Sequence, residues 1–162
     1  MDVPLDHNFP EPILRCLDEF IPDIGLLPLR QIHPVLPQLG DRELLIALHQ
    51  LGYKGLITSN YKMLQNPREL AAVLKTKITV FAIEGVGHDP IRATGALLLD
   101  LPAAITAVNS GASGVFWLRP RRPQPQDPWE LFQRAAEKRH EDPASLYDQV
   151  RVSDLELSVS VV

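Results

Sequence analysis

Three oxygen-bearing side chains come directly after short apolar runs of the sequence. Asp6 follows residues 3–5, Asn60 follows the run 55–58 within the stretch GLITSN, and Glu84 follows residues 78–83. If these runs are parallel strands, their carboxyl ends meet at one edge of a sheet, where ligands bind in open α/β folds. Carboxylate and amide oxygens are hard ligands that suit Mg²⁺. The pattern favours a site at this edge, although polar residues also end strands that bind nothing.

Other chemistries have weaker support in the sequence. Cys16 is the only cysteine, which excludes an internal disulfide and a Cys-based zinc cluster. The stretch GVGHD at 85–89 follows a predicted strand but lacks the third glycine and the lysine of a phosphate-binding loop. A His-carboxylate site would form only if the pairs His7–Asp6 and His88–Asp89 meet. No zinc-type H-x-x-x-H spacing occurs among the five histidines: His7, His33, His49, His88 and His140.

The elements that must position these residues alternate along the chain. Strands are predicted at residues 3–5, 25–29, 54–58, 78–83 and 114–118. Amphipathic helices are predicted near residues 10–20, 42–51, 67–74, 91–108 and 129–140, with the fourth of them interrupted at Pro102. Five strands separated by helices predict an α/β domain with a mainly parallel sheet.

Charge is unevenly distributed between the body and the C-terminal residues. The net charge is −4, and residues 1–140 carry 15 basic and 15 acidic side chains. The excess acid lies in residues 141–162, where only Arg151 opposes it. A neutral body offers no broad electrostatic surface for nucleic acid, so a polyanion would need a local basic patch or a metal. With one cysteine and no expected signal or membrane segment, we expect a soluble, cytoplasmic protein.

Four stretches of the first 83 residues together carry a family resemblance. They are PLDHNFPEPILRCL, GDRELLIAL, GLITSNYKMLQNPREL and KITVFAI, in this order. The ordered set resembles the PIN-like domain of VapC-type toxin ribonucleases. The resemblance implies a three-layer α/β sandwich with about five mainly parallel strands, plus a C-terminal helix and a possible extra strand. It also implies a Mg²⁺- or Mn²⁺-dependent endoribonuclease that acts on RNA, an antitoxin protein as partner and a homodimer.

The resemblance assigns roles to five residues. Asp6 falls on the first acid of the family pattern, and Asp41 and Glu43 fall on the acids at a helix start, with Glu43 the expected inward ligand. Thr58 falls on a strand-end threonine, and Asn60 on the position of an aspartate. In such a site the metal polarises a phosphoryl oxygen and activates a bound water. We expect Asp6, Glu43 and Asp41 to hold the metal, and Asn60 to be a weak ligand.

Each assignment has a structural alternative. The alternative for Asp6 is a helix cap, and Asp41, which follows Gly40, has the position of an N-cap. Glu43 is favoured in a first helical turn by the helix dipole alone. The amide of Asn60 brings no charge to a metal, and the nearby Lys62 replaces an acid of the pattern.

Compensation for these changes could come from neighbouring residues. Glu84 and Asp89 could supply the missing negative charge, and Lys62 could bind a substrate phosphate. Substrate phosphates could also meet the arginines of a Pro/Arg-rich stretch, namely Arg119, Arg121 and Arg122. The alternative function is a PIN-like scaffold that has lost catalysis and acts by binding a partner protein.

The organisation predicted from the sequence has three parts. Residues 1–118 form the α/β domain, 119–128 a linker or arm, and 129–162 a C-terminal helix and acidic tail. The stretch DLELSVSVV at 154–162 alternates apolar and polar side chains, which predicts a strand. We expect this strand to pair with a sheet edge, with exchange between two chains as the favoured arrangement.

Overall fold

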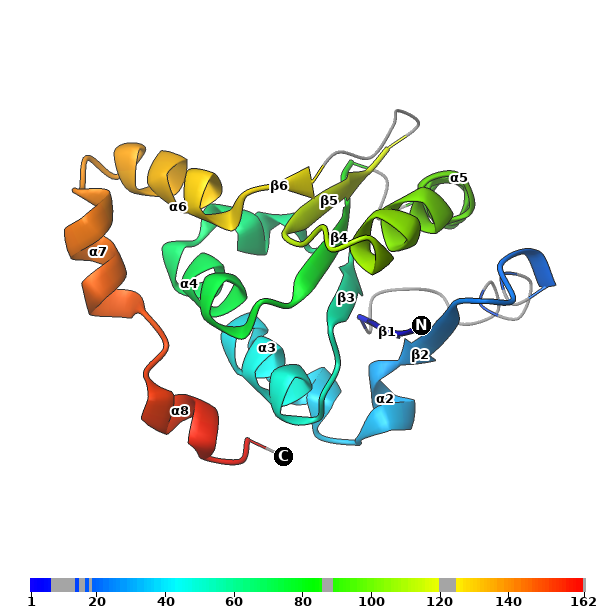
Figure 1. Cartoon of the computed structure of the whole chain (residues 1–162), viewed down its shortest axis with the longest axis horizontal. Helices are drawn as coiled ribbons and strands as arrows, with labels where there is room; N and C mark the ends of the chain where they lie inside the picture. Colours follow the sequence, from blue (N-terminus) through cyan, green and yellow to red (C-terminus); the bar gives the residue numbers. More distant parts are fainter. Residues whose placement is uncertain (7–13, 15–16, 18, 86–88, 120–124, 162) are drawn as a thin grey trace.

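The computed structural model describes residues 1–6, 14, 17, 19–85, 89–119 and 125–161 (Figure 1). Its six-stranded sheet has the order β2-β1-β3-β4-β5-β6, in which β1 to β5 run parallel and β6 runs antiparallel to β5. The strands are β1 (Asp2–Leu5), β2 (Gly25–Pro28), β3 (Gly55–Thr58), β4 (Thr79–Ile83), β5 (Val115–Leu118) and β6 (Pro125–Gln126). The predicted α/β class and mainly parallel sheet are therefore confirmed.

Helices cover both faces of this sheet. Figure 1 shows α3 (Asp41–Gln50), α4 (Pro67–Thr76) and α6 (Pro128–Glu137) on one side and α5 (Pro90–Asn109) on the other. The arrangement is a three-layer α/β sandwich. The remaining helical elements are α2 (Leu29–Ile32), η1 (Leu36–Gln38), η2 (Tyr61–Gln65), α7 (Pro143–Val150) and α8 (Asp154–Ser158). Of the helix predicted near residues 10–20, only Leu14, Leu17, Glu19 and Phe20 are described, and all four are helical.

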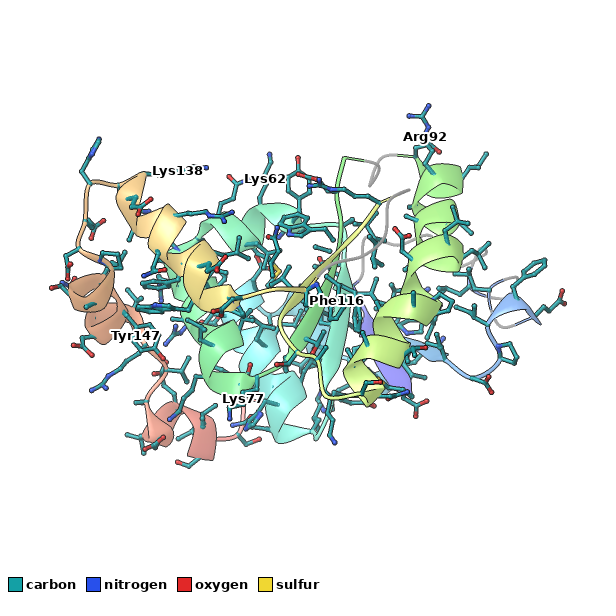
Figure 2. The ribbon with its side chains drawn as sticks, turned by 45° about the horizontal axis from the view of Figure 1, so that its top comes forward. Lys62, Lys77, Arg92, Phe116, Lys138 and Tyr147 are labelled. Atoms are coloured by element: carbon teal, nitrogen blue, oxygen red, sulfur yellow. The ribbon has the colours of Figure 1, made fainter. Side chains whose placement is uncertain are left out.

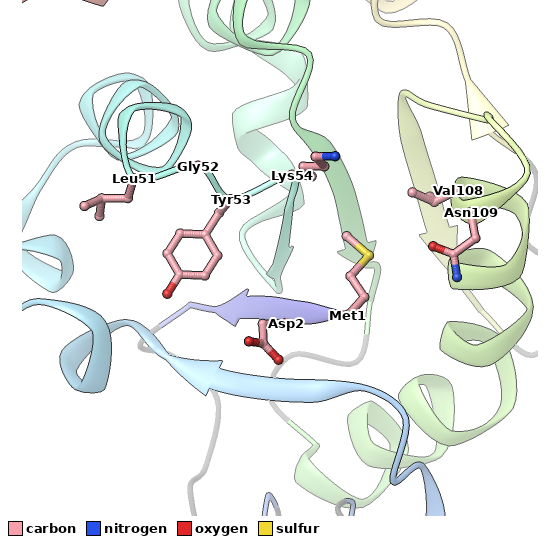
Figure 3. A pocket seen from close by; sticks show the side chains of 8 residues that line it. All are labelled: Met1, Asp2, Leu51, Gly52, Tyr53, Lys54, Val108 and Asn109. Atoms are coloured by element: carbon pink, nitrogen blue, oxygen red, sulfur yellow. The ribbon is translucent and has the colours of Figure 1, made fainter.

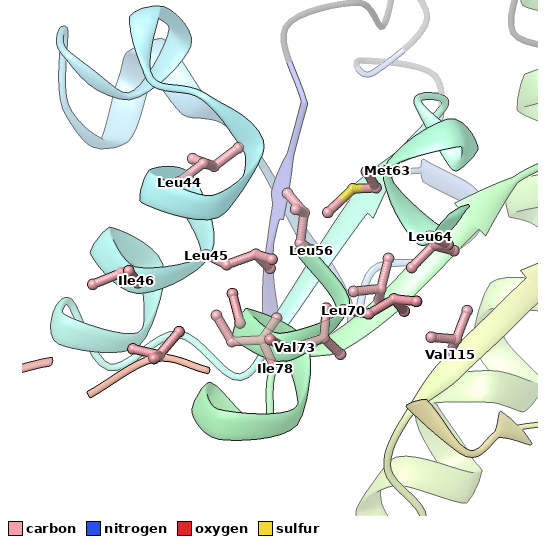
Figure 4. Packing of buried hydrophobic residues seen from close by; sticks show 14 of the residues in the cluster. Leu44, Leu45, Ile46, Leu56, Met63, Leu64, Leu70, Val73, Ile78 and Val115 are labelled. Atoms are coloured by element: carbon pink, nitrogen blue, oxygen red, sulfur yellow. The ribbon is translucent and has the colours of Figure 1, made fainter. Parts of the chain in front are cut away.

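The core is divided by the sheet into two apolar clusters. Along β4, Val80 and Ala82 pack with α3 and α4, whereas Phe81 and Ile83 pack with α5. Successive side chains of a strand point to opposite faces, so a strand covered on both sides must be apolar throughout. Figure 4 shows the cluster beneath α3 and α4. The continuous apolar run 78–83 is explained by this double burial.

Helix α5 differs from its prediction, because it continues through Pro102 without a break. Leu97, Leu101 and Ile105 are buried in the cluster on that face, and this packing outweighs the one backbone hydrogen bond that proline removes. Among the described residues, α5 is the one helix long and apolar enough to cross a membrane. Core helices pass the same test, and α5 lies against the sheet.

The stretch predicted as an arm contributes a strand to the sheet. Residues 125–126 form β6, and the approach of this strand to β5 depends on Gly114. Gly114 has φ +122°, and a Cβ at this position would lie 2.5 Å from the Gln126 carbonyl oxygen. The C-terminal part then packs on the same core, since Phe132 and Leu146 are buried with the side chains of α3 and α4.

The prediction of a C-terminal strand is wrong. Residues 154–158 form α8, whose Ser153 and Glu156 make a reciprocal capping box. The tail, defined here as residues 151–161, lies against α3 of its own chain, where Gln50 Nε2 donates to the Leu157 carbonyl oxygen at 3.1 Å. Capping outweighs the period-2 pattern because it satisfies backbone groups at the helix start, while Leu155 and Val159 stay exposed.

Candidate functional site

Asp6 is fixed at the carboxyl edge of the sheet, meaning the edge at which β1 to β5 end. Its backbone N–H donates to the Ile57 carbonyl oxygen at 3.0 Å, which continues the pairing of β1 with β3. Its side chain is 7% exposed and accepts a hydrogen bond from Thr58 Oγ1 at 2.8 Å. Parallel pairing of β1 and β3 brings these two side chains together across 52 residues of sequence. The structure thus brings Asp6 and Thr58 into contact at this edge of the sheet.

Asn60 links the strand end to helix α3. Its backbone N–H donates to Thr58 Oγ1 at 2.9 Å, and its Nδ2 donates to Asp41 Oδ2 at 3.0 Å. A continuous hydrogen-bonded line therefore runs from Asp6 through Thr58 and Asn60 to Asp41. In this arrangement the Asn60 side chain presents a donor to a carboxylate.

The start of α3 differs from the sequence-based alternatives. Gly40 is the N-cap residue, and Asp41 is the first helical residue and makes no capping bond, so the prediction that Asp41 caps the helix is wrong. Asp41 is half-buried and faces Asn60, whereas Glu43 is exposed. The carboxylate of Glu43 folds back toward Gly40, because a Cβ there would meet Glu43 Oε2 at 2.7 Å. The structure thus places Asp41, rather than Glu43, in contact with the line of hydrogen bonds.

Glu69 is a further acid that reasoning from the sequence did not include in the site. It lies in the first turn of α4, which Asn66 caps through the N–H of Arg68. Its Oε2 atom is buried with no hydrogen-bond partner among the described residues. Burial raises the pKa of Glu69, and the charges of Asp41 and Glu43 raise it further, against opposing contributions from its own backbone and Arg68. The stretch NPREL marked this helix start, but only the fold shows that it faces α3.

The donor set suits a hard divalent cation. Asp6, Asp41, Glu43 and Glu69 offer carboxylate oxygens, and one oxygen of Glu69 lacks a partner in the described part of the chain. A cation beside Glu69 would offset the burial and the neighbouring negative charges that raise its pKa. Among the described residues, no three His, Cys, Asp or Glu side chains are grouped closely enough to enclose a metal by themselves. Mg²⁺, which keeps several of its waters, binds through one or two carboxylates.

The charges that could compensate for Asn60 are engaged elsewhere. Glu84 forms an ion pair with Arg119. Asp89 caps α5 by accepting from the backbone N–H groups of Ile91 and Arg92. Neither carboxylate is therefore available to compensate for Asn60. Among the described residues, Glu69 is the acid that faces the carboxylates of Asp41 and Glu43.

Of the residues predicted to bind substrate, Lys62 and Arg119 are described, and both follow strands at the same edge. Lys62 is exposed on η2, the short helix that begins directly after Asn60. The guanidinium of Arg119 lies over the Trp117 ring, 5.4 Å from its centroid. Arg121 and Arg122 lie outside the described residues, as do His7, His88 and Cys16.

The opposite edge of the sheet contains a cavity that does not include the acids. Its volume is about 540 Å³, and Met1, Asp2, Tyr53 and Lys54 line it together with Val108 and Asn109 near the end of α5 (Figure 3). These residues precede or begin β1 and β3, so the cavity lies at the amino ends of the strands. The cavity is therefore separate from the four acids Asp6, Asp41, Glu43 and Glu69, which we call the acidic site.

Comparison with known proteins identifies no relative. No family model, no curated protein and no solved structure matches this chain.

Proposed function

We propose that this protein is a PIN-like, metal-dependent endoribonuclease that hydrolyses phosphodiester bonds of single-stranded RNA. The observation that carries the proposal is the line of hydrogen bonds from Asp6 through Thr58 and Asn60 to Asp41, at the edge where ligands bind in such sheets. The unpartnered oxygen of Glu69 supports it, since a buried carboxylate needs a counter-charge. The proposal includes the cytoplasmic role of a VapC-type toxin with an antitoxin partner.

The chain's own residues prepare the site for this chemistry. Thr58 fixes the orientation of Asp6 by donating to its Oδ2 atom. Asn60 holds Asp41 toward the site, and the first turn of α4 adds Glu69. A bound Mg²⁺ or Mn²⁺ would supply an activated water and polarise the phosphoryl oxygen.

The experiment follows melting temperature and RNA cleavage as Mn²⁺ is titrated. At a free concentration ten times the dissociation constant, a cation bound only to the folded state stabilises it by about 1.4 kcal/mol. For a domain of this size that corresponds to a rise of about 3–6 °C. Asp6→Asn should abolish both the rise and the cleavage while the protein remains folded.

Asn60→Asp gives the sharper test. Without metal, a carboxylate at residue 60 would face Asp41 in place of an amide donor, so the variant should be less stable than wild type. With Mn²⁺ it should gain more stability than wild type, because two facing carboxylates bind a cation more tightly. Asn109→Asp, the same change at the opposite edge of the sheet, is the control and should show no response to metal.

A scaffold that binds a partner protein is the second candidate. It is favoured by the Asn60 amide, which satisfies Asp41 without any cation. If neither wild type nor Asn60→Asp responds to Mn²⁺ or Mg²⁺, the nuclease proposal fails and the scaffold remains.

A further inference from the structure

A second feature of the carboxyl edge is a basic cavity beside β5 and α6. It has a volume of about 270 Å³ and is lined by Glu84, Trp117, Arg119, Arg134 and Lys138, with Gln65 and Gln126 at its sides. We call it the β5–α6 pocket. It is smaller than the roughly 300–1,000 Å³ of most small-molecule sites, so it suits a compact group rather than a whole cofactor.

Arg119 is held in place inside this pocket. Its guanidinium pairs with Glu84 and lies over the ring of Trp117. The ring is itself fixed, because Trp117 Nε1 donates to Gln126 Oε1 at 2.6 Å and its edge packs against Tyr61, with centroids 6.3 Å apart. An arginine fixed in this way loses little side-chain entropy when it binds an anion.

The charges of the pocket are not balanced. Three cationic side chains, those of Arg119, Arg134 and Lys138, line the pocket together with one carboxylate, that of Glu84. The partner of Arg134 is Glu130, at 3.7 Å with both side chains more than 60% exposed, and such pairs are weak. For Lys138, no side-chain partner occurs among the described residues. The pocket is therefore suited to an anion.

Helix η2 connects the pocket to the acidic site along the chain. Helix η2 begins at Tyr61, directly after Asn60, and its last residues Leu64 and Gln65 line the pocket. Figure 2 shows Lys62 and Lys138 along one side of the molecule, with Lys77 at the opposite side. A chain of phosphates could thus pass from the pocket across η2 to the acids.

We propose that the β5–α6 pocket binds an internucleotide phosphate of single-stranded RNA, at a position next to the phosphodiester that the acidic site would cleave. This inference rests on the proposed function for the identity of the anion. Arg119 provides a fixed contact, and Arg134 and Lys138 close on the phosphate from α6.

The test measures binding of a fluorescent single-stranded oligoribonucleotide in EDTA, so that no cleavage occurs. Each phosphate contact with a single strand contributes about 0.7 to the slope of log K against log salt, or about 5-fold in affinity at 0.1 M salt. Since Arg134 and Lys138 contact the same phosphate, Arg134→Ala with Lys138→Ala should weaken binding about 5-fold and lower the slope by about 0.7. Glu84→Gln should strengthen binding, because it frees Arg119 from its competing carboxylate.

The control removes the same charge from outside the pocket. Arg139→Ala with Lys54→Ala alters the residue after Lys138 and a residue at the amino edge, and it should change affinity less than 3-fold. Equal losses in both double variants, or no binding by wild type, would overturn the proposal. The proposal would also be overturned if polyglutamate competed with the RNA and its affinity had the same dependence on salt. The pocket would then be a surface for acidic peptides.

Failure of this inference can be told apart from failure of the proposed function. RNA binding that depends on the pocket, without metal-dependent cleavage, would retain the pocket and refute the nuclease. Metal-dependent cleavage with an unchanged KM in the Arg134/Lys138 double variant would retain the nuclease and refute the pocket.

Discussion

Replacing Arg42 by methionine tests how the tail is held to the body. Arg42 is 8% exposed although it lies in the first turn of α3. Its NH1 donates to the carbonyl oxygens of Arg68 at 3.0 Å and Val150 at 2.8 Å, and its NH2 donates to Arg151 O at 3.3 Å and Glu156 Oε1 at 3.0 Å. One buried cation thus joins α3, α4 and the tail.

The expected loss of stability follows from these contacts. Removing one partner of a buried charged network costs about 3–5 kcal/mol. Methionine keeps the apolar stem, and the freed carbonyl groups can be hydrated once the tail detaches, so we expect about 3 kcal/mol for Arg42→Met. The Glu156 carboxylate is 44% exposed, so Glu156→Gln should cost less than about 1 kcal/mol.

Urea denaturation is the measurement, with Lys75→Met as the matched control. Lys75 also joins the body to the tail, through Asp154, but the two side chains are 34% and 91% exposed. It should therefore contribute less than about 1 kcal/mol. If Arg42→Met costs no more than Lys75→Met, burial of the guanidinium does not hold the tail and the reasoning is refuted.

Three further outcomes are expected. Glu69→Gln should stabilise the protein at pH 7 by less than about 1 kcal/mol. A raised folded pKa makes the charged form unfavourable near neutrality, so this gain should disappear in urea melts as the pH falls toward 4.5, the ordinary value for Glu. Gly114→Ala should cost about 2–4 kcal/mol, because φ is +122° and the new Cβ meets a backbone carbonyl. In the control, Gly95→Ala in α5, the new Cβ would meet no atom within 4 Å. This variant should raise the free energy of unfolding by up to about 1 kcal/mol in the same melts. Phe132→Ala should cost about 3–5 kcal/mol, since Phe132 is fully buried, and near-unchanged thermal stability would contradict its place in the core.

Local patterns were sufficient to predict the layers of the fold. Runs such as 78–83 predicted buried strands, and the apolar face of residues 42–51 predicted α3, because burial on this sheet obeys the periods of strand and helix. The position of Asp6 and Asn60 at strand ends followed from the same reasoning. Whether they meet depends on strand order, which no local pattern of the sequence gives.

Long-range contacts were beyond such patterns. An arginine in a first helical turn is ordinarily solvated, and nothing local to Arg42 indicates partners more than 100 residues away. Glu69 joins the acids only because α3 and α4 pack side by side. The tail had a readable signal in the spacing of Ser153 and Glu156, which is that of a capping box, but the alternating apolar residues were given more weight.

The contacts of Arg42 also determine when, during synthesis, the helix turns that carry Asp41 and Glu69 can be fixed in place. Glu156 is synthesised 114 residues after Arg42, a delay of about 6–23 s at ordinary elongation rates. Closing so long a loop is entropically costly, so it occurs late in folding. Until then the guanidinium stays hydrated, and the first turns of α3 and α4, which carry Asp41 and Glu69, lack their shared anchor. A nascent chain therefore carries its acids on unanchored turns until residue 156 has left the ribosome.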